Sequence, residues 1–134
     1  MKTICAFLLF LLSAMNASPQ ELFIRNLTLE HKKNPAGIEI SQPRFSWIIE
    51  GTGRNVLQTS FSLEVATDKG FSAHGITLKS GIVRSDKSTL VDYNGSALKS
   101  SQKYYWRVKV WDNKKRESGS VSYTHLTLPT ILLV

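Results

Sequence analysis

The stretch YYWRVKVW at residues 104–111 indicates most clearly how this chain folds. Every second residue from Tyr104 to Val110 is apolar or aromatic, and the residues between them include Arg107 and Lys109. A period of two places one set of side chains in a core and the other set towards solvent. The stretch therefore predicts a β-strand with one buried face and one wet face.

The same period recurs along the chain, and no helical period is sustained. The alternating segments lie at Leu27–Leu29, Phe45–Ile49 and Phe61–Val65, with shorter candidates at Leu78–Val83 and Thr89–Tyr93. Turn-forming residues separate them at 34–37, 51–53 and 94–95. Short strands at this spacing predict an all-β sandwich of about seven antiparallel strands.

Within that fold, we predict that Trp47, Tyr104 and Trp106 form the structural core. Leu98 lies six residues before Tyr104, which is typical of the tyrosine corner in fibronectin type III-like sandwiches. In that arrangement the ring packs in the core and the hydroxyl bonds to the preceding loop. Tyr105 and Trp111 fall in the outward series, where a ring can contact a sugar or a neighbouring domain.

The first 17 residues predict a secretory signal peptide. Lys2 precedes an apolar run at 4–12, and small residues follow up to Ala17, after which we expect cleavage. The run is shorter than the roughly 20 residues that span a bilayer, although an N-terminal membrane anchor is the alternative. We expect a secreted protein, periplasmic or extracellular, that keeps no membrane attachment. Cys5 leaves with the signal, so the mature chain has no thiol or disulfide.

The last 14 residues, VSYTHLTLPTILLV at 121–134, contain no Asp, Glu, Lys or Arg. Residues 121–130 resemble one reading frame of a transposon end sequence used in DNA library preparation. We interpret 121–134 as a translated adapter, with a natural last strand as the alternative. On this interpretation the domain is 18–120, its last strand is non-native, and the native protein continues past Ser120.

Residues that carry chemistry are sparse and show no site pattern. His31, His74 and His125 lack metal-ligand spacing, and no nucleophile elbow or phosphate-binding glycine loop occurs. We expect the carboxylates of Glu64, Asp92 and Asp112 to be solvated at the surface. The sequence thus predicts no catalytic, cofactor-binding or metal-binding residue, and no cofactor.

The chain is basic, with a net charge of +7 and a pI of about 9.7. Much of the charge surrounds the 104–111 stretch, at Lys99, Lys103, Arg107, Lys109, Lys114, Lys115 and Arg116. We interpret this cluster as a solvated face, with an acidic glycan site as the alternative. No nucleic-acid-binding fold signature accompanies it, so we expect no nucleic-acid partner.

Several motifs occur in a distinctive order. They are NPAGI at 34–38, PRFSW at 43–47, Gln58, SGIV at 80–83, and Leu98 followed by YYWRVKVWD at 104–112. In this order, over residues 22–120, they resemble the N-terminal domain of bacterial α-L-rhamnosidases, the inverting glycoside hydrolases of family 78. The resemblance implies a fibronectin type III or immunoglobulin-like sandwich that precedes other β domains and an (α/α)6 catalytic barrel. The barrel releases terminal L-rhamnose and has no counterpart here, so no catalytic residue carries over.

These observations lead to one principal hypothesis and one alternative. In the first, the chain is a non-catalytic N-terminal accessory domain from a secreted α-L-rhamnosidase that hydrolyses terminal L-rhamnosides. Its partners would be later domains of that enzyme, with rhamnose-containing glycans as further candidates. The alternative is a free-standing carbohydrate-binding or adhesion module of the same fold, suggested by Tyr105, Trp111 and the basic cluster. A very small hydrolase is a remote third.

Overall fold

The computed structural model describes residues 21–33, 40–118 and 124–127 of the chain. Its strands are β1 (Leu22–Leu29), β2 (Arg44–Gly51), β3 (Gln58–Ala66), β4 (Ile76–Lys79), β5 (Val83–Arg84), β6 (Val91–Asp92), β7 (Lys103–Asp112) and β8 (Thr124–Thr127). No helix that could cross a membrane occurs in these described segments. The predicted signal peptide, the turn at 34–37 and most of 121–134 lie outside them.

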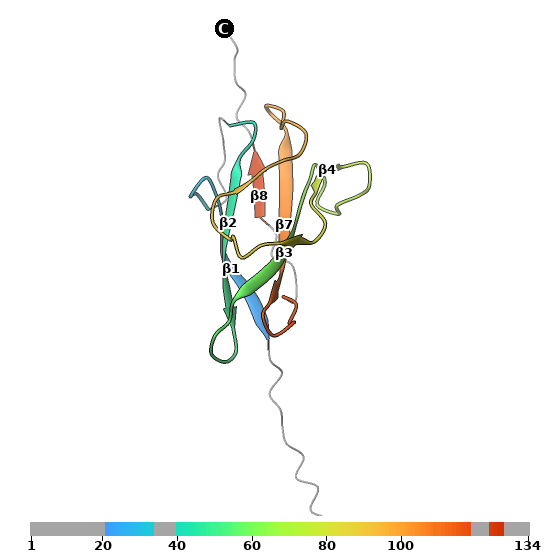
Figure 1. Cartoon of the computed structure of the whole chain (residues 1–134). Helices are drawn as coiled ribbons and strands as arrows, with labels where there is room; N and C mark the ends of the chain where they lie inside the picture. Colours follow the sequence, from blue (N-terminus) through green and yellow to red (C-terminus); the bar gives the residue numbers. More distant parts are fainter. Residues whose placement is uncertain (1–20, 34–39, 119–123, 128–134) are drawn as a thin grey trace, which may run out of the picture.

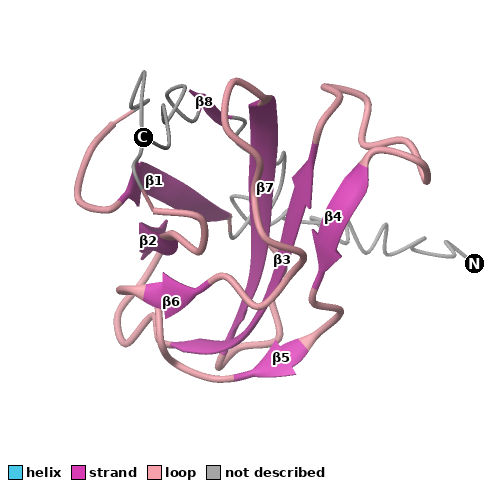
Figure 2. Cartoon of the chain, turned by 90° about the horizontal axis from the view of Figure 1, so that it is seen from above, coloured by secondary structure: helices cyan, strands magenta, loops and turns pink. Residues whose placement is uncertain are grey.

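Two antiparallel sheets face each other (Figures 1 and 2). One has the order β1-β2-β6, and the other has the order β4-β3-β7-β8 with β5 also paired to β3. Strand β7 pairs with one edge of β3. The short strands β4 and β5 pair, one after the other, with the opposite edge of β3. They form two pieces of one edge strand, so the sandwich has seven strand positions, and the predicted all-β sandwich is confirmed.

The edge strand predicted over Leu78–Val83 is wrong in its extent, because it is interrupted. Gly81 has a φ of 64°, which lies in the left-handed region that favours glycine. The Leu63 N–H donates to the Ser80 hydroxyl at 2.8 Å, and that hydroxyl donates to the Gly81 carbonyl at 2.8 Å. The chain therefore kinks between β4 and β5, and Ile82 in this kink is 68% exposed to solvent. Hydrophobic alternation carries no information on such a change in backbone angle.

Large rings from both sheets fill the space between them. Trp47, Tyr104 and Trp106 are each at most 2% exposed. The Phe45 ring lies 4.7 Å from the Trp106 ring, centroid to centroid, and the Trp47 and Phe61 rings lie 5.3 Å apart. Both pairs are tilted or edge-on, the arrangements that aromatic rings prefer. Because each pair joins β2 to the opposite sheet, these contacts hold the two layers together.

Two buried polar side chains, Tyr104 and Gln58, connect separate parts of the sandwich through hydrogen bonds. The Lys99 N–H donates to the Tyr104 hydroxyl at 2.7 Å, which ties the loop before β7 to that strand. Buried Gln58 accepts from Trp47 Nε1–H at 2.8 Å and donates to the Ser85 and Lys87 carbonyls at 3.0 and 2.9 Å. Gln58 thus joins β2, β3 and the segment after β5, a role that its place in the sequence motif does not reveal.

The segment interpreted as an adapter contributes β8. Its backbone pairs antiparallel with residues 103–106 of β7. An extended segment of any origin can occupy an open sheet edge, because the pairing uses backbone groups only. The adapter interpretation therefore stays a prediction.

Candidate functional site

The two outward aromatic residues proposed to contact a sugar or a domain, Tyr105 and Trp111, both lie on β7 and are both half-buried. They are six positions apart along one strand, which corresponds to about 20 Å. Lys103 Nζ lies 5.6 Å from the Tyr105 ring centroid, and Lys109 Nζ lies 5.6 Å from that of Trp111. The structure does not bring the two rings together, so each would contact a ligand or domain separately.

The outer face of β7 between these rings is covered. The Arg107 guanidinium lies 4.1 Å from the ring centroid of Phe71, which is 7% exposed and belongs to the loop between β3 and β4. Arg107 also forms an ion pair with Glu64 on β3, and Lys79 Nζ lies 4.0 Å from the same carboxylate. A continuous aromatic platform for a sugar chain is therefore interrupted by the loop and the ion pairs.

A groove of about 240 Å³ lies beside Trp111 and is called the Trp111 groove below. It is lined by Thr59, Ser60, Ile82, Arg84, Trp111, Asp112 and Lys115. Ile82 comes from the kink between β4 and β5, whereas Trp111 comes from the end of β7. Sequence reasoning selected Trp111 but not Ile82, because the topology brings together residues that are far apart along the chain.

Asp112 forms part of this groove, and its carboxylate is fully buried. It accepts the backbone N–H groups of Lys114 at 3.0 Å and Arg116 at 2.8 Å, and the Arg116 Nε–H at 2.7 Å. Burial by itself raises the pKa of Asp112, but these donors outweigh it and hold the pKa below its usual value. Asp112 is thus kept ionised as a structural anchor, whereas a general acid needs a raised pKa.

The expectation that three carboxylates are solvated is wrong for two of them. The side chain of Asp92 is 64% exposed, but those of Glu64 and Asp112 are 13% and 0% exposed. Glu64 is outward on its strand as its parity predicts, yet the Arg107 and Lys79 side chains cover it. Strand parity assigns a side chain to a face but does not say what folds over that face.

Arg116 and its neighbours fix the end of the sandwich next to the Trp111 groove. Arg116 donates from its guanidinium to the Thr52 carbonyl at 2.8 Å and to the Thr52 hydroxyl at 3.1 Å. Lys114 Nζ donates to the Arg54 carbonyl at 2.8 Å. The turn after β7 is thereby attached to the loop between β2 and β3, so the groove has a rigid base.

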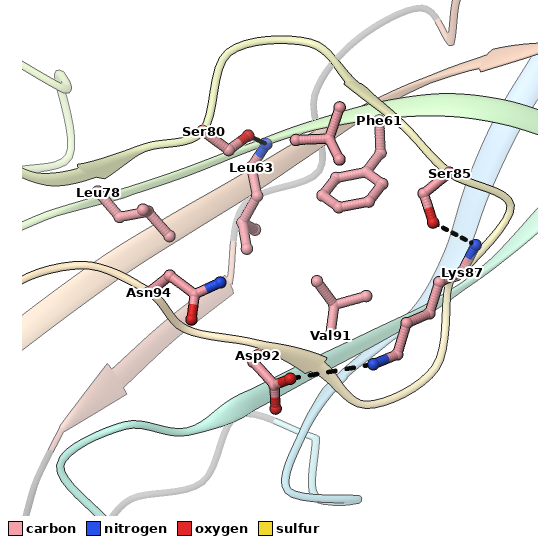
Figure 3. Close-up of a pocket in the computed structure, with 10 residues that line it drawn as sticks. Phe61, Leu63, Leu78, Ser80, Ser85, Lys87, Val91, Asp92 and Asn94 are labelled. Atoms are coloured by element: carbon pink, nitrogen blue, oxygen red, sulfur yellow. Dashed lines mark hydrogen bonds and ion pairs between the residues drawn. The ribbon is translucent and has the colours of Figure 1, made fainter.

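A second cavity, of about 400 Å³, opens between the sheets beside β5 and β6 (Figure 3). It is lined by Phe61, Leu63, Leu78, Val83 and Val91 on its apolar side and by Ser80, Ser85, Lys87, Asp92 and Asn94 on its polar side. Lys87 Nζ lies 4.0 Å from the Asp92 carboxylate, and the Lys87 N–H donates to the Ser85 hydroxyl at 3.0 Å (Figure 3). Sequence reasoning missed this cavity, because it forms where separate edge strands do not meet. Among the described residues, no three His, Cys, Asp or Glu side chains cluster as metal ligands would.

Comparison with known proteins identifies what this chain is similar to. The family model described as "Rha78A-like, N-terminal immunoglobulin domain" matches residues 24–128. An α-L-rhamnosidase of Formosa agariphila is 44% identical over 93 residues, which are 68% of this chain and 10% of that protein. An α-L-rhamnosidase of Streptomyces avermitilis is 33% identical over 91 residues, which are 68% of this chain and 9% of that protein.

A solved structure gives the same result. The Streptomyces avermitilis α-L-rhamnosidase complexed with L-rhamnose superposes with a TM-score of 0.75 and 29% identity, covering 81% of this chain and 10% of that one. The chain therefore spans about a tenth of the length of these relatives.

Proposed function

Since the chain belongs to the family of Rha78A-like N-terminal immunoglobulin domains, we propose that it is the non-catalytic accessory domain of a longer α-L-rhamnosidase. The family match carries this proposal, together with relatives in which the matched region is only about a tenth of the protein. The parent enzyme would hydrolyse terminal L-rhamnosides, and this domain would pack on later domains and help to position the catalytic unit.

The geometry of β7 favours this accessory role over a free-standing sugar-binding module. Tyr105 and Trp111 are about 20 Å apart, and the Arg107–Phe71 contact lies between them. Tandem sugar stacking needs neighbouring rings, whereas contact with a protein domain can use one ring and the side chains around it.

We further propose that the domain is exported. The apolar run at 4–12 and the small residues before Ser18 support a cleaved signal peptide. Export would place the domain in the periplasm or outside the cell, where polysaccharides are found.

One preparation tests both export and the absence of catalysis. The chain is expressed with its first 17 residues in a bacterial host, recovered from the periplasm or medium, and weighed by mass spectrometry. The expected mass is that of a chain starting at Ser18; recovery of the uncleaved chain from the membrane fraction would contradict export.

The recovered protein is then incubated with an aryl α-L-rhamnoside beside a full-length relative as positive control. We expect no release of the aryl alcohol above the buffer rate, because on this proposal the catalytic unit of the parent enzyme supplies the general acid and base. Turnover that is lost on Glu64→Gln or Asp92→Asn would instead show that the domain is itself a hydrolase.

A further inference from the structure

We propose that the Trp111 groove is the surface on which the rest of the parent polypeptide docks, through a patch that carries carboxylates around an apolar side chain. This inference rests on the proposed function. It specifies which surface of the domain contacts the rest of the polypeptide and which chemical groups the partner surface carries. In Figure 2 the region lies at β5, which pairs with β3 on the edge opposite to β7.

The first observation is the exposed apolar surface of the groove. Ile82 is 68% exposed next to half-buried Trp111. A Cβ at Gly81 would meet no atom within 4 Å, so the left-handed backbone, and not lack of space, is what favours glycine there. The kink thus holds an isoleucine in solvent beside a tryptophan. Exposed apolar patches rimmed by polar groups mark interaction surfaces.

The second observation is the charge of the groove. Arg84 and Lys115 line it, and neither side chain forms an ion pair or hydrogen bond with any residue that the structure describes. The cations next to them, by contrast, are neutralised: Lys109 by Glu117 and Arg116 by Asp112. Covering Arg84 and Lys115 with an uncharged surface would bury unpaired cations, which is strongly unfavourable. The docking surface must therefore bring carboxylates.

The same charges exclude a second copy of this chain as the symmetric occupant. An isologous contact would place Arg84 and Lys115 of one molecule against the same residues of another, and like charges in contact are repulsive. The matched segment makes up only about a tenth of each relative, so a parent polypeptide of similar length has ample surface to supply an acidic patch.

The third observation is that the groove is already formed. The buried Asp112–Arg116 pair and the bonds from Arg116 to Thr52 hold its base in place. A preformed site loses little conformational entropy on binding, which favours a stable contact.

The opposite sheet provides a matched comparison surface. Phe23 and Ile48 are 42% and 50% exposed there, on β1 and β2. Between them Arg25 and Glu50 form an ion pair with each other. This surface is also apolar, but its charges are paired with each other. It therefore has no unpaired cation that an acidic partner would neutralise.

The test is hydroxyl-radical footprinting of this chain and of the full-length protein encoded at its genomic locus. In the full-length protein we expect Trp111 to be oxidised at least about tenfold more slowly, equivalent to about 1.4 kcal/mol of opening free energy. Phe23 serves as the internal control and should react at similar rates in both proteins. Equal oxidation of Trp111 in both would overturn the docking proposal.

The charge part of the proposal is tested by the double variant Arg84→Glu, Lys115→Glu in the full-length protein. It should return Trp111 oxidation towards the rate in the isolated chain, whereas the control Arg25→Glu should leave Trp111 protected. If Trp111 stays protected from oxidation in the double variant, the proposal that the docking surface is acidic is wrong. If the genomic locus does not encode a protein longer than this chain, the proposed function itself is wrong. If it encodes a longer protein in which Trp111 is not protected, only the docking inference is wrong.

Discussion

Replacement of Trp106 by alanine is expected to lower the free energy of unfolding by about 3–5 kcal/mol. Trp106 is 1% exposed, and its ring packs against Phe45 of the opposite sheet at 4.7 Å. Its removal leaves a cavity between the two layers that rigid strands cannot close. Small domains have only about 5–15 kcal/mol of stability in total, so the variant should be largely unfolded at moderate urea concentrations.

Urea denaturation followed by far-ultraviolet circular dichroism measures this effect. The control is Trp111→Ala, which removes the same residue type from the outward face of the same strand and should cost less than about 1 kcal/mol. Equal losses for the two variants would contradict the assignment of inward and outward faces on β7.

The second large effect is expected from Asp112→Ala, at about 3–5 kcal/mol of lost stability. The Arg116 side chain is only 9% exposed, so removal of its carboxylate leaves a nearly buried guanidinium without its counter-charge. The backbone N–H groups of Lys114 and Arg116 also lose their acceptor. Asp92→Ala is the matched control: its side chain is 64% exposed, and the expected change is within about 0.5 kcal/mol.

The same pair makes stability depend on pH, with a sign that follows from the pKa. The pKa of Asp112 is below its ordinary value of 3.8 in the folded chain. Near and below pH 3.8 the unfolded state therefore binds more protons, so the free energy of unfolding falls as the solution is acidified. The contribution is complete well above pH 3.8 and is lost as the pH falls through the folded-state pKa. Asp112→Asn should flatten this acid limb in a urea series at several pH values. An unchanged acid limb, or a cost for Asp112→Ala no greater than that for Asp92→Ala, would refute the anchoring role.

The alternation in the sequence was sufficient to predict the sandwich, because the period of a strand assigns its residues to two faces. It placed Tyr104 and Trp106 on the inward face, and both are buried. The same parity continues through Val110 to Asp112 and was available as a signal that Asp112 points inward. The expectation that Asp112 is solvated assigns it to the turn after this strand, whereas Asp112 is the last residue of β7 itself. Charged residues are rarely buried unless they are paired. The pairing with Arg116 four residues later explains the exception.

The candidate site was only partly predictable, for a different reason. Trp111 could be selected from its own strand, but Ile82 joins it through the pairing of β5 and β7 with β3. The exposure of Ile82 depends on the φ of Gly81, which no periodicity reports. Grooves between strand edges are set by topology and backbone angles, and these are properties of the whole sheet.

Sequencing of the genomic DNA across the codon for Ser120 shows whether this domain belongs to a longer enzyme. We expect the frame to continue from Ser120 without a stop codon, to diverge from VSYTHLTLPT, and to encode a protein several times longer than this chain that includes a rhamnosidase catalytic domain. Genomic DNA that encodes the residues through Val134 as they stand here, followed at once by a stop codon, would contradict this expectation.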